Sequence, residues 1–121
     1  MPKIFKDRSG RLFIEDMPQL FVSISHSNGV VAACCSDAPV GIDIEKIRKT
    51  TARLKKKIAD NSSISDEEFF KDWTLKEAYL KASGISFSKM LLLSVDEICA
   101  KSTSTSERYQ DFYLSIVKIE K

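Results

Sequence analysis

The chain has 121 residues, which is enough for one domain with its own hydrophobic core, and we expect a single domain over residues 1–121. Apolar residues make up 43% of the chain and charged residues 30%, as in ordinary soluble globular proteins. No apolar run approaches the ~20 residues that span a bilayer, and the N-terminal segment lacks the apolar core of a secretory signal. We therefore expect a cytoplasmic protein without a membrane partner. The net charge of +2 does not indicate a particular class of partner.

The first part of the chain predicts strands joined by turns. After a turn at residues 9–10 and a short strand, the segment FVSISHS alternates, with Val22, Ile24 and His26 on one face, which is typical of a half-buried strand. An Asn-Gly pair then predicts a hairpin turn, and the apolar run VVAACC predicts a strand covered on both faces. These strands and the next one, VGIDIE, would form a three-stranded meander over residues 21–27, 30–35 and 40–45.

Three cysteines, Cys34, Cys35 and Cys99, lack the spacing typical of a zinc site, and sequence neighbours rarely form a disulfide. We expect them to be small buried apolar residues in a reducing compartment.

The second part of the chain predicts two helices followed by strands. A short basic helix covers residues 50–60, and Ser65 with Glu68 forms a capping box that opens a longer helix over 66–83, which Gly84 ends. Two strands are expected at 90–100 and 111–120, separated by a polar turn or disordered hairpin tip at 101–107. The predicted fold class is α+β, with an antiparallel sheet packed on one long and one short helix.

Basic residues gather in residues 46–57, a stretch that contains seven of them and no acid. This stretch is either a solvated helix face or a docking surface for an acidic partner, such as a protein or a phosphate-rich ligand. The basic residues are Lys46, Arg48, Lys49, Arg53, Lys55, Lys56 and Lys57.

Two acids, Asp43 and Glu45, stand on the same face of the strand at 40–45, because alternate residues of a strand share a face. Gly41 precedes them on that face and is expected to leave room for a ligand. Two carboxylates this close repel each other unless a cation lies between them, and Mg²⁺ with oxygen ligands would relieve the repulsion. The alternative is an exposed strand face whose acids pair with Lys46 or Arg48.

A third acid, Glu77, lies in the long helix, four residues after Trp73 and four before Lys81, so the three side chains share one helical face. This arrangement is either an ordinary i,i+4 ion pair or a third metal ligand together with a lysine for phosphate charge, with Lys76 beside them. The only histidine, His26, follows Ser25 near the end of a strand and is either structural or a donor to a phosphate.

Together, the segments SISHS, VGIDIE and WTLKEAYLK strongly resemble, in this order, the 4′-phosphopantetheinyl transferase superfamily. The family pattern is G-[IV]-D followed by [FW]-[SCT]-x-K-E-[AS]-x-x-K. It is met here by Gly41, Ile42, Asp43, Trp73, Thr74, Lys76, Glu77, Ala78 and Lys81.

The resemblance implies transfer of 4′-phosphopantetheine from coenzyme A to a serine of an apo acyl or peptidyl carrier protein, with release of adenosine 3′,5′-bisphosphate. It implies Asp43, Glu45 and Glu77 as ligands of magnesium, without excluding manganese, and Glu77 as the group that orients or deprotonates the serine. Lys76 and Lys81 resemble the residues that meet the pyrophosphate, and Ser25 and His26 resemble contacts to the 3′-phosphate side of the nucleotide. The basic stretch 46–57 would meet the acidic helix of the carrier.

The order of the segments, with the histidine first, resembles the larger transferases that activate surfactin-type peptide synthetases and consist of two similar halves. This chain resembles the second half alone, at the size of a holo-acyl-carrier-protein synthase. We therefore expect a homo-oligomer in which a neighbouring subunit replaces the missing half, a trimer in preference to a dimer.

Two alternatives stay open at this point. One is a non-catalytic, half-length module that binds coenzyme A or a carrier protein. The other is a nucleic-acid binder that uses the basic stretch, although no interleaved aromatic residues or known motif support it, so no nucleic acid is expected as partner. The sequence does not indicate whether fatty-acid, polyketide or peptide synthesis is served.

Overall fold

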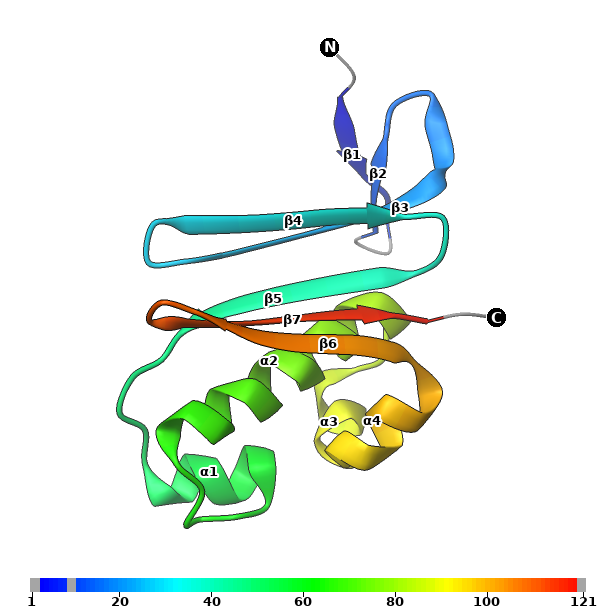
Figure 1. Ribbon diagram of the computed structural model, residues 1–121. Coiled ribbons are helices and arrows are strands. Elements are labelled where there is room, and N and C mark those ends of the chain that lie inside the picture. The colour runs from blue at the N-terminus through cyan, green and yellow to red at the C-terminus, as the bar shows by residue number, and fades with distance from the viewer. Residues whose placement is uncertain (1–2, 9–10, 120–121) are drawn as a thin grey trace.

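The structure is a computed structural model that describes residues 3–8 and 11–119. It is an α+β fold in which helices cover one side of a set of antiparallel strands, as predicted (Figure 1). The strands are β1 (Ile4–Lys6), β2 (Leu12–Ile14), β3 (Met17–Ser27), β4 (Val30–Ser36), β5 (Val40–Lys46), β6 (Thr103–Tyr109) and β7 (Phe112–Lys118), and the helices are α1 (Ala52–Ala59), α2 (Asp66–Ser83), α3 (Phe87–Leu91) and α4 (Val95–Lys101).

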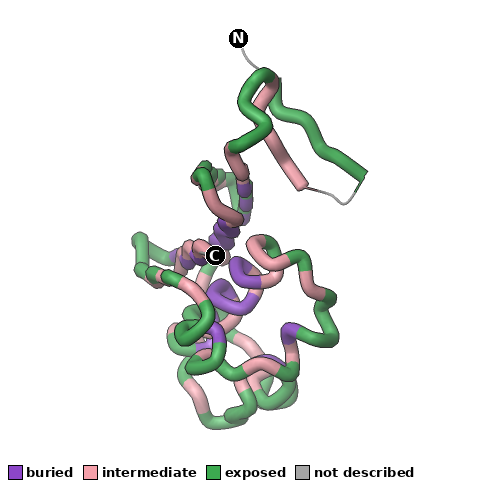
Figure 2. The backbone as a smooth tube through the Cα atoms, turned by 90° about the vertical axis from the view of Figure 1, so that its right-hand side faces the viewer, coloured by how far each residue is buried: buried purple, intermediate pink, exposed green. Residues whose placement is uncertain are grey.

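The strands form two sheets, in the orders β1-β2-β3-β4 and β5-β7-β6. The predicted meander is therefore wrong at its third strand, because β5 takes its backbone hydrogen bonds from β7 rather than from β4. Figure 2 shows that β1 and β2 form an arm that projects from the body of the molecule, while buried residues gather where β3, β5 and α2 meet. The predicted turn at residues 9–10 lies outside the described residues.

Three serines of β3 join the two sheets. Ser23, Ser25 and Ser27 are buried, and their hydroxyls accept hydrogen bonds from the backbone N–H groups of residues 42, 44 and 46 on β5, at 3.0, 3.1 and 3.1 Å. These N–H groups lie on the edge of β5 that has no partner strand, where unpaired donors would otherwise be left buried. The predicted alternation of β3 is confirmed, and the serine face is the buried one because its hydroxyls serve the neighbouring backbone.

Helix α2 begins and ends as predicted. The Ser65 hydroxyl accepts a hydrogen bond from the N–H of Glu68, and Gly84 takes a left-handed conformation with φ of 75°. Along its length α2 packs on β5 and β7, and Leu75, Ala78 and Tyr79 form a core with Val117 of β7 and Ile98 of α4.

Gly41 marks the closest approach of β5 and α2. A Cβ atom at this position would lie 2.0 Å from the backbone oxygen of Ala78 and 2.8 Å from the backbone nitrogen of Ala82. The expectation that Gly41 leaves room for a ligand is wrong, because the helix backbone itself fills that space.

Two segments near the C-terminus differ from the prediction. Residues 90–100, expected as a strand, belong to helices α3 and α4, because Ser86 and Ser94 cap the two helices and Ser94 forms a capping box with Glu97. Residues 101–107, expected as a turn or disordered tip, contain most of β6, which pairs with β7 along its whole length. Threonine favours strands, and the serines of β6 alternate toward the helices.

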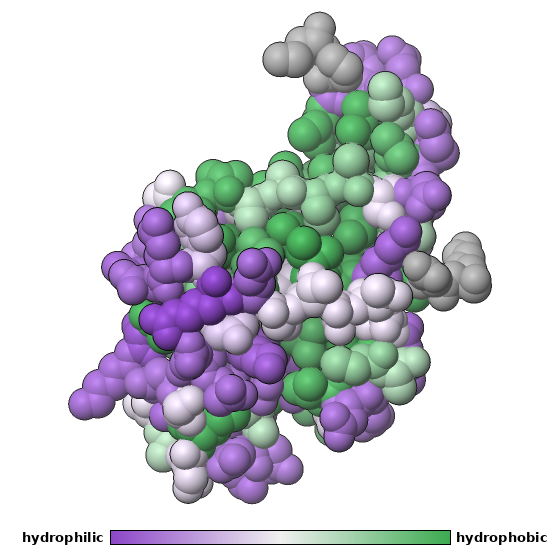
Figure 3. All heavy atoms as spheres, viewed as in Figure 1, coloured by the Kyte–Doolittle hydropathy of each residue, from purple (hydrophilic) through white to green (hydrophobic). Residues whose placement is uncertain are grey.

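Strand β4 is not covered on both faces. Val31 is 69% exposed, and Ala33 and Cys35 on the same face are also exposed. The cysteines are free thiols, and the prediction that they are buried is wrong for Cys35 and Cys99, while Cys34 is half-buried. Figure 3 shows apolar residues gathered over β4 and β5, above a band of more polar residues along β6.

Candidate active site

Three of the predicted site residues meet where β5 lies against α2. Lys81 extends from α2 and donates to the backbone oxygen of Ile42 at 2.9 Å and to Oδ1 of Asp43 at 3.4 Å. Glu77 stands one turn earlier on the same helical face and interacts electrostatically with Asp43 and Lys81. The i,i+4 spacing on α2 and the close approach at Gly41 therefore produce one cluster of two acids and one lysine.

Glu45 lies at the margin of this cluster. It is half-buried, it affects both Asp43 and Glu77 electrostatically, and its Oε2 forms an ion pair with Arg48 at 3.4 Å. The ion pair with Arg48 that the alternative interpretation expected is therefore present, and the role of Glu45 as a metal ligand stays a prediction.

Ser25 is placed to orient Asp43. Its hydroxyl donates to Oδ1 of Asp43 at 3.2 Å and accepts from the N–H of Ile44 at 3.1 Å. Because both of its hydrogen bonds are made inside the protein and the residue is buried, Ser25 holds the carboxylate in place rather than presenting its hydroxyl to solvent. His26 is exposed, since alternate residues of β3 point to the opposite face.

The surroundings raise the pKa of both acids. Burial raises the pKa of Asp43 from 3.8 to about 7, Lys81 opposes the shift, and the charges of Glu45 and Glu77 add to it. Burial also raises the pKa of Glu77, again against Lys81 and with the help of Glu45. The folded protein therefore resists full ionisation of the cluster.

We expect this cluster to make the protein less stable at pH 8 than at pH 5 in buffer with a metal chelator. A carboxyl whose pKa is raised by folding contributes stability that is complete below its unfolded pKa of 3.8 and is lost as the pH rises through about 7. Between pH 5 and 8 the loss for Asp43 is roughly 2–3 kcal/mol.

Urea unfolding at the two pH values measures this loss, and Asp43→Asn is the control that removes the titrating group. The variant should lack the Asp43 part of the pH dependence. Equal pH dependence in the two proteins would contradict the raised pKa.

The donor set suits a hard divalent cation. Asp43 is 6% exposed, and among the described residues its Oδ2 atom finds no hydrogen-bond partner, so this buried oxygen can still receive a cation. In the described ranges no group of three or more histidine, cysteine, aspartate or glutamate side chains stands close enough to hold a metal ion by itself. Mg²⁺ usually binds through one or two carboxylates and completes its shell with water and phosphate oxygens, so the residues present fit this ion once a phosphate ligand is bound.

Lys76 is the predicted site residue that the structure places elsewhere. It is only 4% exposed, and its Nζ donates to the backbone oxygen of Ile58 at 2.6 Å. Residues next to each other in a helix point ~100° apart, so Lys76 faces α1 whereas Glu77 faces β5. A contact between Lys76 and a bound pyrophosphate does not fit this position.

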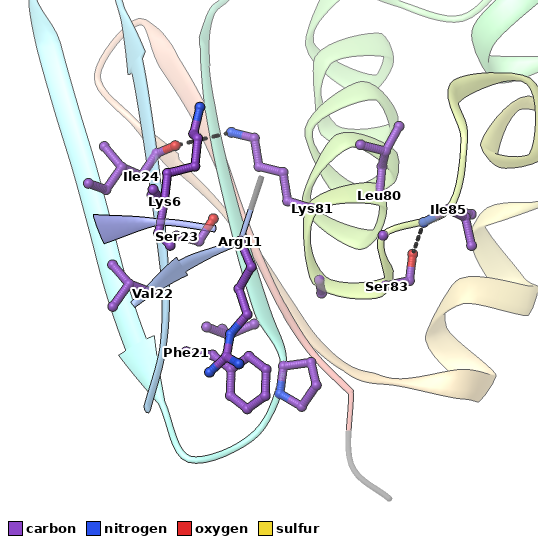
Figure 4. A pocket seen from close by; sticks show the side chains of 15 residues that line it. Lys6, Arg11, Phe21, Val22, Ser23, Ile24, Leu80, Lys81, Ser83 and Ile85 are labelled. Carbon is purple, nitrogen blue, oxygen red and sulfur yellow. Dashed lines mark hydrogen bonds between the residues drawn. The ribbon is translucent and has the colours of Figure 1, made fainter. Parts of the chain in front are cut away.

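A cavity of about 720 Å³ opens beside the cluster, between the N-terminal arm and the end of α2. Lys81 lines it and also touches Asp43, and Lys6 and Arg11 add two more cations from the arm. Figure 4 shows Lys81 reaching from α2 toward Ile24 of β3, and Arg11 lying against Phe21. The cavity can therefore take an anionic ligand at its inner end.

Arg11 was missed in the sequence. Its guanidinium carbon lies 3.8 Å from the centre of the Phe21 ring, and its Nη2 atom donates to the backbone oxygens of Pro18 and Leu20 at 3.0 and 3.1 Å. In the sequence, Arg11 is recognisable only as a basic residue directly after the predicted turn at 9–10. The pairing of β2 with β3 is what brings it to the cavity.

None of the helices within the described part of the chain is long and apolar enough to cross a membrane.

Comparisons with known proteins agree with this arrangement. A 4′-phosphopantetheinyl transferase gsp from Aneurinibacillus migulanus is 34% identical in an alignment of 91 positions that covers 65% of this chain and 37% of that protein. The 4′-phosphopantetheinyl transferase Sfp of Bacillus subtilis (strain 168) is 29% identical over 89 residues, 65% of this chain and 40% of that protein. The chain thus spans about two fifths of the length of the curated relatives that it matches.

The family model described as the 4′-phosphopantetheinyl transferase superfamily matches residues 39–119, more than half of the chain. The matched region contains β5, all four helices and the last two strands, and hence Asp43, Glu45, Glu77 and Lys81. This chain belongs to the 4′-phosphopantetheinyl transferase superfamily.

Proposed function

We propose that the protein transfers 4′-phosphopantetheine from coenzyme A to a serine hydroxyl of an apo acyl or peptidyl carrier protein. The observation that carries this proposal is the cluster of Asp43, Glu77 and Lys81 beside a cationic cavity that Lys81 also lines, in a chain of this superfamily. Phosphoryl transfer depends mainly on positioning and charge neutralisation, which acids holding a cation and lysines holding phosphate supply.

Coenzyme A would occupy the cavity beside α2. Its volume of about 720 Å³ is in the range of cofactor sites, and its three cations, Lys6, Arg11 and Lys81, suit a ligand with several phosphates. Because Lys81 belongs to both the cavity and the acidic cluster, the diphosphate bridge would lie beside it. The proposed contact of His26 with the 3′-phosphate remains a prediction, whereas Ser25 acts through Asp43.

Asp43, Glu45 and Glu77 would hold Mg²⁺ together with oxygens of the diphosphate. When bound, the ion neutralises charge on the diphosphate and on the leaving group. Since the unpartnered Oδ2 of Asp43 would gain a ligand, adding MgCl₂ at pH 8 to protein already saturated with coenzyme A should raise the melting temperature further for the wild-type protein and not for Asp43→Asn.

In the transfer, the carrier serine oxygen forms a bond to the phosphorus next to pantetheine. The bond between this phosphorus and the bridging oxygen breaks, and adenosine 3′,5′-bisphosphate leaves with that oxygen. Glu77 is the group proposed to orient the serine and accept its proton, and its raised pKa makes it a better base than an ordinary glutamate. Lys81 stabilises the negative charge that develops on the phosphates.

The carrier is proposed to dock its acidic helix on the basic stretch 46–57. Some basic residues of this stretch already form ion pairs within the chain. Arg48 pairs with Glu45, Lys55 with Asp66 and Lys56 with Asp60. The side chains of Arg53 and Lys57 on α1 are exposed and present positive charge outward.

A homo-oligomer, preferably a trimer, is proposed to complete the site. One observation supports it: Val31, Ala33 and Cys35 leave an apolar face of β4 exposed. Light scattering coupled to gel filtration should show a species larger than the 13.7 kDa monomer at micromolar concentration. A monomer that is active at that concentration would overturn this part of the proposal.

The proposed function is tested by incubating the protein with coenzyme A, Mg²⁺ and an apo carrier, followed by mass spectrometry of the carrier. Transfer adds one phosphopantetheine group to the serine. Because the match covers only about two fifths of the length of these relatives, the second candidate is a module that binds without catalysis. Calorimetric binding of coenzyme A with no mass change on fatty-acid, polyketide and peptide carriers would favour that candidate over the transferase.

A further inference from the structure

We propose that Lys76 is a positioning residue that fixes helix α1 against α2, so that its effect falls on carrier binding and not on coenzyme A. The carrier part of this inference rests on the proposed function. Lys76 and Glu77 are neighbours in the sequence, but their side chains leave α2 on different faces. The inference therefore gives Lys76 a role separate from that of Glu77.

The geometry at the end of α1 is the first support. The last backbone oxygens of a helix have no partner within the helix, and Ile58 lies in the final turn of α1. Its oxygen accepts a hydrogen bond from Nζ of Lys76 at 2.6 Å, in a buried setting. An ammonium group at a helix C-terminus also complements the helix dipole.

The cost of burying Lys76 is the second support. A buried ammonium group costs free energy unless its protons find hydrogen-bond partners, and Nζ of Lys76 has such a partner in the backbone oxygen of Ile58. A lysine kept 4% exposed without an acid in direct contact indicates that its hydrogen bond to α1 matters to the fold.

Helix α1 needs such an anchor. It has eight residues, fewer than the roughly 12–15 at which an isolated helix becomes marginally stable, and it buries only Ile58. At its other end, Asp66 accepts from the N–H of Thr50 at 3.2 Å and pairs with Lys55 at 3.1 Å. Lys76 and Asp66 thus hold the two ends of α1 on α2.

The consequence concerns the basic surface. Arg53 and Lys57 are carried by α1, so their direction relative to Glu77 depends on how firmly α1 is held. A loosened α1 would present these charges over many orientations, and binding an acidic helix would first require ordering them. Coenzyme A would be unaffected, because Lys76 does not line its cavity.

The test uses Lys76→Met, which keeps the side-chain stem and removes the donor, with Lys101→Met on α4 as the matched loss of one exposed charge. Hydrogen exchange should show about tenfold lower protection of the α1 amides in Lys76→Met, with α2 unchanged. The dissociation constant for a fluorescently labelled apo acyl carrier protein should rise about tenfold, and that for coenzyme A, measured by calorimetry, should stay within twofold. Lys101→Met should change none of these.

The outcomes separate the alternatives. A weakened affinity for coenzyme A with unchanged exchange in α1 would mean that Lys76 contacts the pyrophosphate, and would overturn the inference. If Lys76→Met does not fold, Lys76→Gln, which keeps a shorter donor, is measured in the same way and should show the same split with a smaller effect. Binding and hydrogen exchange are measured without turnover. If the protein binds both ligands but transfers nothing, the transferase function is rejected, while the measurements on Lys76→Met still decide the role of Lys76. A wild-type protein that binds no carrier would overturn the carrier part.

Discussion

Replacing Asp43 with alanine should reduce transfer to the carrier by at least about a thousandfold while the protein stays folded. Asp43 carries a buried oxygen that has no hydrogen-bond partner among the described residues, and it forms an ion pair with Lys81, which lines the cavity. Its loss would remove a proposed metal ligand and the carboxylate that Lys81 contacts, leaving Lys81 with the backbone oxygens of Ile24 and Ile42. The same labelling assay, followed over time at saturating coenzyme A, measures the effect.

The control is Asp96→Ala, which removes an exposed acid in the first turn of α4 and should leave the rate unchanged. Glu77→Ala should be as severe as Asp43→Ala if Glu77 accepts the serine proton. An Asp43→Ala variant that retains activity within tenfold of wild type would reject the proposed site.

Asp43 should also lower the free energy of unfolding at pH 8 while it supports activity. With a pKa raised to about 7, an ionised Asp43 at pH 8 is a net cost to the fold in the absence of a cation. Asp43→Asn should therefore be more stable than wild type at pH 8 without metal, although it is inactive. This combination is typical of active sites, whose buried charges are retained for chemistry rather than for stability.

Much of the site could be predicted because its residues have short-range relationships. Asp43 and Glu45 share a strand face by their spacing of two, and Glu77 and Lys81 share a helix face by their spacing of four. The N-cap at Ser65 and the stop at Gly84 fixed the limits of the helix that carries them. What joins the two elements is the family pattern, since no local rule says that β5 lies on α2.

Other features escaped prediction because a different interaction decided them. Apolar content suggested a strand at 90–100, but the serine caps of α3 and α4 determine the local structure. The alternation of β3 did not indicate that the face of Ser23 and Ser25 is the buried one, and their burial follows from the hydrogen bonds that they accept from the backbone of β5. The contribution of Arg11 depends on strand pairing across the arm, which sequence spacing does not reveal.

Gly41→Ala should leave most of the protein unfolded, with a loss of more than about 4 kcal/mol. The added Cβ would lie 2.0 Å from the backbone oxygen of Ala78, and backbone atoms of a packed helix cannot turn aside as a flexible side chain can. To accept it, α2 would have to move away from β5, which would open the core around Ala78 and separate Asp43 from Lys81.

Gly29→Ala is the matched control for this experiment. Gly29 has a φ of 83°, so alanine is strained there, but no atom lies within 4 Å of the new Cβ, and the expected loss is only about 1 kcal/mol. Urea unfolding and circular dichroism compare the two variants directly. If Gly41→Ala were no less stable than Gly29→Ala, α2 could not lie as close to β5 as described. The acids of the two elements would then have no reason to meet, so this stability measurement tests the geometry of the site without any assay of activity.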